Sequence, residues 1–135
     1  MKYLVDTSVV TRASNEHVKS VLRAFLLNGE ICRTTLVDLE MGGQARNSSE
    51  WEGLTDSVVP FPTVETAERN LQRALQVQRL LATKSQRGRK IPDLLIAAVA
   101  EEHNLTVLHY DSDFDIIAEV TGQSCRWIVP AGTID

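Results

Sequence analysis

The sequence predicts an α/β domain built around a mainly parallel sheet, and two observations lead to this fold class. Short runs rich in apolar and β-branched residues alternate along the chain with longer segments whose apolar residues recur at helical spacing. The composition, with 43% hydrophobic and 24% charged residues and only 7 Gly and 4 Pro, is typical of a globular protein rather than a fibrous or disordered one. The length of 135 residues suits one domain, which we expect to span residues 1–135.

The first three elements expected along the chain are a strand, a helix and a second strand. Residues 2–6 form a short β-rich run that ends in an acid, Asp6. The helix is expected to end at Asn28-Gly29, because apolar residues precede this turn at helical spacing: Val18, Val21, Leu22, Phe25 and Leu26. Residues 30–33 then suit a second short strand.

The middle of the chain predicts two helices with a weaker strand between them. Thr34 or Thr35 can cap a helix that runs to about Arg46. The run Val58-Val59-Pro60-Phe61 suggests a third strand. A long helix is then expected to begin at Thr63 and to pack closely through the small and apolar residues of one face: Ala67, Leu71, Ala74, Leu75 and Ala82.

The last third of the chain predicts two more helices and two more strands. A helix is expected from Asp93 to about Glu102, because the preceding proline has the fixed φ and the missing N–H that suit a first turn. Residues 106–109 suit a fourth strand, residues 112–120 a short helix, and residues 126–129 a fifth strand. Strands that alternate with helices in this way form parallel sheets joined by right-handed crossovers.

The charge is unevenly distributed along the chain. The net charge of −4 argues against a general nucleic-acid binder, but the segment from Arg69 to Pro92 contains no acidic residue and half of the 14 basic ones. These are Arg69, Arg73, Arg79, Lys84, Arg87, Arg89 and Lys90. The segment is either a solvated helix face followed by a basic loop or a local surface for phosphate groups, since phosphate contacts depend on the nearby field.

Cysteine and hydrophobicity patterns exclude several classes of protein. Cys32 and Cys125 are too few for a disulfide framework or a thiolate metal site, so we expect both to be core thiols. The histidines are too scattered to form a metal site: His17, His103 and His109. The longest apolar run, residues 94–100, is too short to span a membrane, and Asp6 comes too early for a signal peptide. We therefore expect a cytoplasmic protein.

The most informative feature of the sequence is the placement of its acids. Asp6 ends the first predicted strand and Asp111 follows the fourth, and open parallel sheets bind ligands beyond the carboxyl ends of their strands. Asp93 begins a helix that is otherwise so apolar that it must be largely buried. Glu40 lies inside a predicted helix. Converging acids raise one another's pKa unless a cation holds them, and oxygen ligands favour Mg²⁺ or Mn²⁺, which activate water at a phosphodiester.

Each of these acids also has an ordinary structural explanation when it is considered singly. Asp93 is an acid at a helix N-terminus, where the helix dipole favours negative charge, and Glu40 is a common type of exposed helix residue. Asp111 and Asp113 suit a turn and a helix start. The prediction of a site therefore depends on their joint placement.

Four motifs of the chain, taken together, resemble those of PIN-domain ribonucleases of the VapC toxin type. They are Asp6-Thr7-Ser8 after the first strand, the helical Glu40, the run from Ile91 to Ala98, and His109-Tyr110-Asp111-Ser112-Asp113-Phe114. The closing Trp127-Ile128-Val129-Pro130 with Gly132 is also similar, so that the resemblance covers essentially the whole chain. It implies a three-layer α/β/α fold with a mainly parallel central sheet of about five strands.

The resemblance also implies a function and roles for the acids. It implies an endoribonuclease toxin of a type II toxin–antitoxin system that depends on Mg²⁺ or Mn²⁺ and cleaves RNA by metal-activated water. Asp6 and Asp93 would be the direct metal ligands, and Glu40 would help to bind metal or position the water. The remaining site residues implied are Asp111 and Asp113, which complete the acidic pocket, and Thr7 or Ser8, which orient Asp6. Many relatives carry Thr or Ser at the position of His109, so assistance from a hydroxyl there is not expected.

The partners implied are RNA, a cognate VapB-type antitoxin, and a second copy of the chain in a homodimer or a higher toxin–antitoxin assembly. Arg87, Arg89 and Lys90 are then candidates to contact RNA beside the acids. The alternative from another class is a non-catalytic module whose acids hold a structural cation or a basic peptide. A phosphotransfer site of the receiver or haloacid type is disfavoured because no second Asp follows Asp6 closely.

Overall fold

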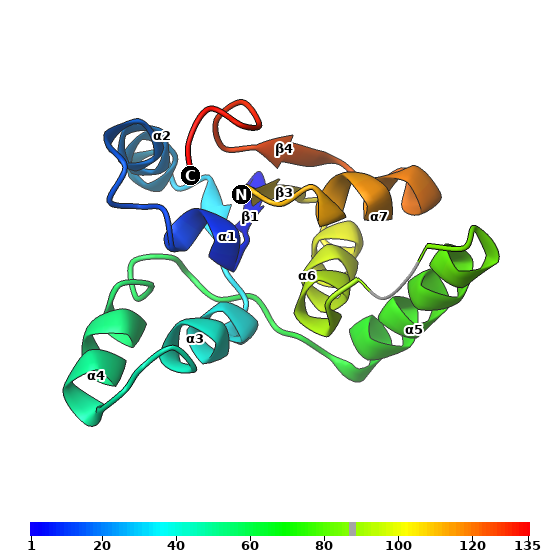
Figure 1. Ribbon diagram of the computed structural model, residues 1–135, viewed down its shortest axis with the longest axis horizontal. Coiled ribbons are helices and arrows are strands. Elements are labelled where there is room, and N and C mark those ends of the chain that lie inside the picture. The colour runs from blue at the N-terminus through cyan, green and yellow to red at the C-terminus, as the bar shows by residue number, and fades with distance from the viewer. Residues whose placement is uncertain (87–88) are drawn as a thin grey trace.

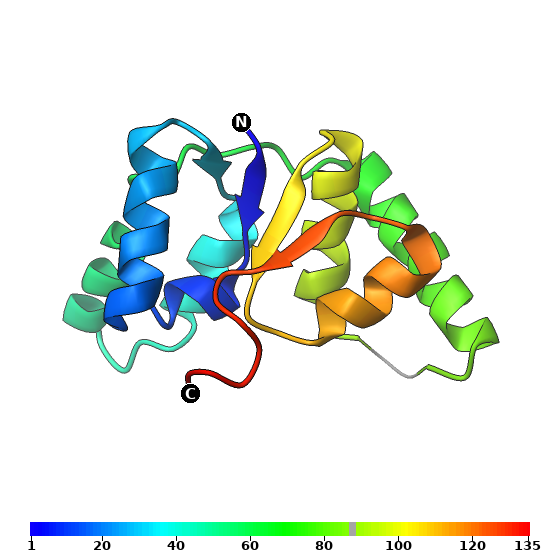
Figure 2. The same cartoon turned by 90° about the horizontal axis from the view of Figure 1, so that it is seen from above.

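In the computed structural model, which describes residues 1–86 and 89–135, a four-stranded sheet forms the centre of the molecule (Figures 1 and 2). The strands lie in the order β2-β1-β3-β4 and every pair is parallel. They are β1 Tyr3–Val5, β2 Ile31–Cys32, β3 Thr106–His109 and β4 Cys125–Trp127. The predicted α/β class with a parallel sheet is confirmed, although the described residues form four strands instead of about five.

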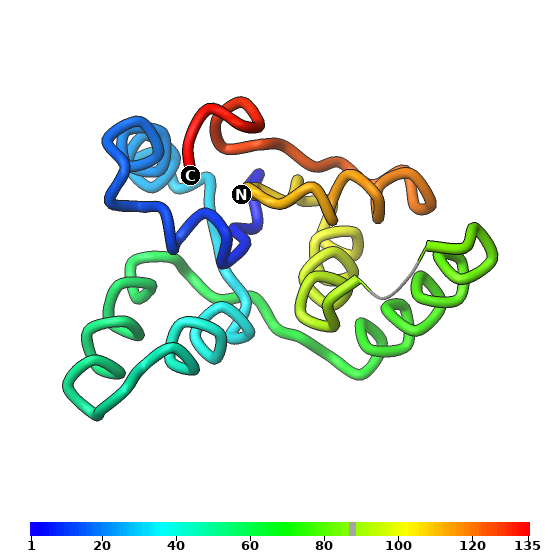
Figure 3. The backbone as a smooth tube through the Cα atoms, in the orientation of Figure 1, coloured from blue at the N-terminus to red at the C-terminus, as the bar shows by residue number. Residues whose placement is uncertain are grey.

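Helices cover both faces of the sheet, which gives the predicted three layers. In Figures 1 and 2, α2 lies on one side of the sheet and α5, α6 and α7 lie on the other. The tube in Figure 3 follows the chain through α3 and α4, which pack against each other near the end of β2. The bounds are α1 Thr7–Val10, α2 Glu16–Leu27, α3 Thr35–Gly42, α4 Ser48–Asp56, α5 Glu68–Thr83, α6 Ile91–Glu102 and α7 Asp113–Thr121.

The core extends over both faces of the sheet, and on one of them α6 packs against the two inner strands, β1 and β3. All residues from Leu94 to Ala100 are buried, as the apolar run in the sequence predicted. They pack with Leu4, Val5, Val107 and Leu108 of the strands, none of which is exposed. Burial of one such aliphatic side chain stabilises the fold by about 1.5–3 kcal/mol, so this layer fixes α6 firmly against the sheet.

The strand predicted at residues 58–61 is wrong. Val58 to Pro60 form turns and Phe61 lies in a bend, while Thr63 makes only an isolated bridge to Arg33. Val58 and Phe61 are nevertheless buried, so their apolar character anchors a loop in the core rather than a strand in the sheet. The fifth strand expected at residues 126–129 is in fact β4, which begins and ends earlier.

The helices differ from prediction in several places: α3 ends at Gly42 and not near Arg46, α6 begins at Ile91 and not at Asp93, α5 begins late, and α1 and α4 were not predicted. α5 begins at Glu68 and not at Thr63, because the side chain of Asn70 accepts a hydrogen bond from the backbone N–H of Ala67 and closes the first turn there, at 2.8 Å. The helix α1 was not predicted, because it has only four residues. The helix α4 was not predicted either, because none of its residues is buried and its sequence therefore lacks apolar residues at helical spacing. Asn47 caps this helix.

Within residues 1–86 and 89–135, no helix combines the length and the hydrophobicity that crossing a bilayer requires.

The buried cap of α5 gives a test of the fold. Asn70→Ala removes two hydrogen bonds: the one that the side chain accepts from the Ala67 N–H, and the one that it donates to Glu102 Oε1 at 3.3 Å. The substitution should therefore lower the free energy of unfolding by about 1–2 kcal/mol. Urea unfolding followed by circular dichroism measures this change. The matched control is Gln72→Ala, an exposed residue one position beyond the first turn, which should change stability by less than about 0.5 kcal/mol. Equal effects of the two variants would contradict the capping role.

Candidate functional site

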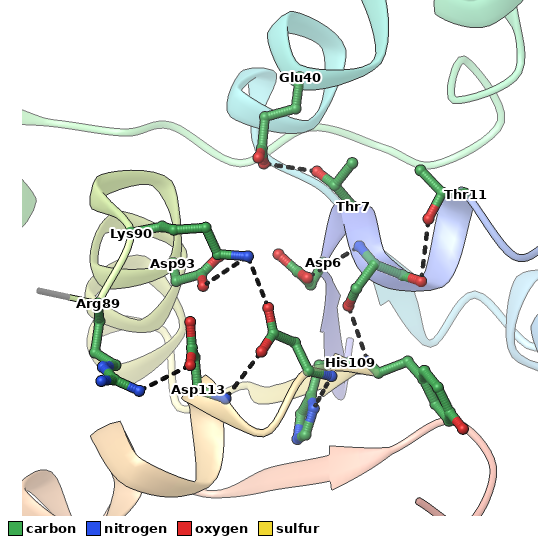
Figure 4. A network of polar contacts seen from close by, with 12 residues as sticks. Asp6, Thr7, Thr11, Glu40, Arg89, Lys90, Asp93, His109 and Asp113 are labelled. Carbon is green, nitrogen blue, oxygen red and sulfur yellow. Dashed lines mark hydrogen bonds and ion pairs between the residues drawn. The ribbon is translucent and has the colours of Figure 1, made fainter. Parts of the chain in front are cut away.

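A pocket of about 610 Å³ opens at the carboxyl-terminal edge of the sheet, and four acids from four parts of the chain line it. Asp6 follows β1, Glu40 comes from α3, Asp93 from the first turn of α6, and Asp111 from the connection between β3 and α7. Because β1 and β3 are adjacent and parallel, their carboxyl ends meet at this edge. All four acids line this one pocket, and Figure 4 shows Asp6, Glu40 and Asp93 approaching it from three different elements.

Asp6 is a buried acid at the junction of the sheet and α1. Its backbone N–H donates to Leu108 O of β3 at 2.9 Å, and its Oδ2 accepts the Ser8 N–H at 3.0 Å as the cap of α1. Oδ1 is buried and has no hydrogen-bond partner among the described residues. Burial raises the pKa of the Asp6 carboxyl, hydrogen bonding from Ser8 opposes this rise, and the charges of Glu40 and Asp111 add to it.

Asp93 is a second buried acid and approaches the pocket from the opposite side. Its side chain is held in the first turn of α6, where the helix N-terminus favours negative charge. Burial raises the pKa of Asp93 to about 7, and the charge of Asp6 contributes to the rise while Lys90 opposes it. Asp93 Oδ2 also lacks a hydrogen-bond partner within the described chain. Two buried carboxylate oxygens without donors therefore belong to one pocket.

Asp111 and Asp113 flank this pair at the start of α7. Asp111 Oδ1 accepts the Asp113 N–H at 2.9 Å, and Asp111 Oδ2 accepts the Lys90 ammonium at 2.9 Å. Burial works to raise the pKa of Asp111, but these two donors outweigh it and hold the pKa below its usual value. Asp113 is bound by Arg89 at 2.9 Å and does not line the pocket, although one oxygen each of Asp93, Asp111 and Asp113 lies within 4.8 Å of the others.

The hydroxyl groups after β1 bind different partners. The Thr7 hydroxyl donates to Glu40 Oε1 at 2.7 Å, so it orients Glu40 rather than Asp6. The backbone N–H of Ser8 is the group that binds Asp6, while the Ser8 hydroxyl accepts the Tyr110 N–H at 2.9 Å. Asp6, Glu40 and the connection after β3 are thus tied together through Thr7 and Ser8.

His109, the last residue of β3, is a buried aromatic ring. It is fully buried between the rings of Phe114 and Trp127, and its Nδ1 accepts the Asp111 N–H at 3.2 Å. Burial lowers the pKa of His109, and the nearby acids Asp115 and Asp111 oppose this effect. Its Nε2 lies 4.0 Å from Asp115 Oδ1, and one atom each of His109, Asp115 and Cys125 lies within 4.8 Å of the others. Its role is to hold the backbone at Asp111.

The basic segment is largely paired with acids. Arg69 binds Glu102, and Arg73 binds Glu101 with two hydrogen bonds of 2.7 and 3.1 Å. Arg89 and Lys90 bind the site acids, as described above. Arg87 lies outside the described residues. Four cations of the segment are therefore paired with acids of the last third of the chain, so these four do not form a purely solvated face.

The donor set fits a hard divalent cation. It consists of carboxylate oxygens only, which is the ligand type that Mg²⁺ and Mn²⁺ prefer. The unpartnered oxygens of Asp6 and Asp93 are buried polar groups that otherwise cost free energy, and cation binding would satisfy such oxygens. Among the described carboxylates, those of Asp93, Asp111 and Asp113 each have an oxygen within 4.8 Å of the others. The geometry can therefore hold a divalent ion, although it does not select one ion over another.

A parallel α/β sheet with carboxylates gathered beyond the carboxyl ends of its strands defines a class of protein suited to cation-dependent phosphodiester chemistry. The family model described as PIN domain matches residues 3–120. The chain belongs to the PIN domain family.

The chain is also similar over its whole length to curated proteins of this class. It is 56% identical over 135 residues to Ribonuclease VapC51 of Mycobacterium tuberculosis (strain ATCC 25618 / H37Rv), covering 100% of this chain and 98% of the relative. It is 39% identical over 134 residues to Ribonuclease VapC21 of the same organism, covering 98% and 97%. Among solved structures, VapBC2 from Rickettsia felis bound to a promoter DNA fragment shares the fold, with a TM-score of 0.76 and 17% identity over 94% of this chain and 98% of that one.

The raised pKa of Asp93 predicts a pH dependence for the metal-free protein. The folded chain keeps this proton up to about pH 7, whereas the unfolded chain releases it near pH 4, so stability falls as pH rises between these values. Asp93→Asn should raise the free energy of unfolding by about 2–4 kcal/mol at pH 8 and change it little at pH 4. Urea titrations with a chelator measure both values. The exposed Asp56→Asn is the control, and the same pH profile for both variants would contradict the assignment.

Proposed function

We propose that this chain is an endoribonuclease that depends on Mg²⁺ or Mn²⁺ and acts as the toxin of a type II toxin–antitoxin pair. The observation that carries the proposal is the convergence of Asp6, Glu40, Asp93 and Asp111 in one pocket. The full-length identity to two proteins named ribonucleases supports RNA as the substrate. A single domain over residues 1–135 carries the whole activity in this proposal.

Asp6 and Asp93 are proposed as the direct ligands of the cation. Both are almost completely buried, and each presents an oxygen without a donor among the described residues. When bound, the cation supplies Lewis-acid stabilisation of the phosphodiester and lowers the pKa of a bound water. Burial of the two acids serves this purpose, because carboxylates that water does not solvate bind a cation more strongly.

Glu40 is proposed to position the attacking water and accept its proton. Thr7 engages Oε1 of Glu40, which fixes the carboxylate and leaves Oε2 for a hydrogen bond from water. Glu40 is partly exposed, in contrast to Asp6, so water reaches it from the mouth of the pocket. Ser8 acts indirectly: its N–H binds Asp6, and its hydroxyl accepts the Tyr110 N–H, so that Ser8 holds these two segments in position.

Asp111 and Asp113 are proposed to complete the acidic site. Asp111 lines the pocket and can contribute a further oxygen toward the cation. Asp113, which Arg89 binds, holds the N-terminus of α7 and thereby the loop that carries Asp111. Arg87, Arg89 and Lys90 are proposed to place the RNA backbone beside these acids, since a cation near the cleavage point attracts phosphate.

A cognate VapB-type antitoxin is the proposed protein partner, together with a second copy of the chain in a cytoplasmic homodimer or larger assembly. The likeness to VapBC complexes over more than nine-tenths of the chain supports an antitoxin. Exposed apolar side chains on α5, namely Leu71 and Leu75, offer a surface that another chain can cover.

Substitution of the two proposed ligands tests the enzyme assignment. Asp6→Asn and Asp93→Asn keep the shape of the side chain and remove its charge, so each should lower Mn²⁺-dependent cleavage of total cellular RNA by at least about 100-fold. Sequencing of the new RNA ends measures cleavage, and circular dichroism confirms the fold.

The control for this experiment is Asp56→Asn, which changes an exposed acid at the end of α4 and should cleave like the unaltered chain. Full activity of both Asp6→Asn and Asp93→Asn would reject the assignment. Tight Mn²⁺ binding by the unaltered chain without any RNA turnover would favour the non-catalytic metal-binding or peptide-binding module instead.

The proposed RNA contacts predict a change in salt dependence. For single-stranded RNA the logarithm of the binding constant falls with the logarithm of salt concentration by about 0.7 per phosphate neutralised. Arg87→Ala combined with Arg89→Ala should therefore weaken binding and flatten this slope by about 0.7 to 1.4, where the lower value applies when Arg89 stays bound to Asp113. Fluorescence anisotropy with a labelled RNA measures the slope. An unaltered slope would remove both arginines from the RNA path, and Arg23→Ala on α2 controls for loss of positive charge elsewhere.

A further inference from the structure

Lys90 places a positive charge among the acids that are proposed to hold the cation. Its ammonium lies 2.9 Å from Asp111 Oδ2 and 3.7 Å from Asp93 Oδ2, and Figure 4 shows it directed into the acidic pocket. Lys90 is the N-cap residue of α6, three positions before Asp93. The chain thus carries its own counterion on the helix that carries a proposed ligand.

We propose that Lys90 is a mobile internal counterion, which neutralises Asp93 and Asp111 in the cation-free protein, is displaced when the divalent cation binds, and then contacts a phosphate of the substrate. This inference rests on the proposed function for its last step, whereas the first two steps concern the cation alone.

Competition follows from the geometry of the two oxygens. A divalent cation bound directly to Asp111 Oδ2 or to Asp93 Oδ2 must lie about 2 Å from that oxygen. The Lys90 ammonium already binds Asp111 Oδ2 and lies close to Asp93 Oδ2. Two cations sharing these oxygens would repel each other in a partly buried pocket, where charges are poorly screened. The ammonium must therefore leave Asp111 for the divalent cation to use that carboxylate.

Lys90 is suited to leave, whereas its neighbour Arg89 is not. The Lys90 side chain is 61% exposed, so its release into solvent uncovers little surface. The Arg89 side chain is 19% exposed and binds Asp113, which lies outside the pocket lining. A lysine is also a compact charge on a flexible stem, while arginine favours fixed planar contacts. The two adjacent cations therefore divide into a fixed one and a mobile one.

The released ammonium stays at the mouth of the pocket. Lys90 lines it together with the polar residues Ser8, Thr11, Arg12 and Ser112. The acids of the pocket repel a phosphate that enters this mouth. A released Lys90 ammonium at the same place attracts the phosphate. Displacement of Lys90 would thus make the site receptive to RNA only after the cation is in place.

The test compares cation binding and RNA binding in Lys90→Met. In the RNA-free protein, Mn²⁺ titrated by calorimetry should bind about 10-fold more tightly than to the unaltered chain. With saturating Mn²⁺, the KM for RNA should rise several-fold, so the two affinities move in opposite directions. Lys19→Met, which removes one charge from α2, should change neither affinity, and Lys90→Arg should keep Mn²⁺ binding at or below that of the unaltered chain.

Each arm of this experiment can overturn the inference separately. Equal or weaker Mn²⁺ binding in Lys90→Met would reject the counterion, and tighter Mn²⁺ binding with an unaltered KM would reject the phosphate contact. If the unaltered chain binds Mn²⁺ but cleaves no RNA, the ribonuclease assignment and the phosphate contact both fail, while the calorimetry still decides on the counterion.

Discussion

The fold forces several carboxylates together, and the side chains around them are arranged to oppose the resulting repulsion. The adjacent parallel strands β1 and β3 bring Asp6 and Asp111 to one edge, and the buried helix α6 brings Asp93 to the same place. Burial removes the water that would solvate these charges, which is why the pKa of Asp6 and that of Asp93 are raised. Such an arrangement destabilises the isolated fold, and it is useful to a protein that binds a divalent cation there.

The surrounding residues compensate for this repulsion without abolishing it. Ser8 donates to Asp6, Thr7 to Glu40, and Lys90 and Arg89 to Asp111 and Asp113. Two oxygens, Asp6 Oδ1 and Asp93 Oδ2, keep no hydrogen-bond donor among the described residues. The acids at the rim are therefore held in position by neighbouring side chains, whereas each of the two most buried acids keeps an oxygen without a hydrogen-bond donor, and the Lys90 ammonium lies 3.7 Å from that oxygen of Asp93. This division matches a site in which the inner acids bind a cation and the outer ones fix the surrounding loops.

Much of this arrangement could be predicted from the sequence, because it follows from local patterns. Strand ends located Asp6 and Asp111, and the apolar run after Asp93 showed that this acid must be buried. Other features depend on contacts between distant segments and leave no local signal. The ion pair of Lys90 with Asp111 is one, and the bond from Thr7 to Glu40 is another. The strand expected at residues 58–61 was wrong because buried side chains anchor a loop as well as they fill a strand.

We expect Asp6 and Asp93 together to bind one divalent cation, and anomalous diffraction from crystals soaked in Mn²⁺ would locate that cation. An anomalous peak is expected between these two side chains, at a direct ligand distance of about 2 Å from an oxygen of each. A peak bound only by other residues, or no peak at a Mn²⁺ concentration that supports RNA cleavage, would contradict this expectation.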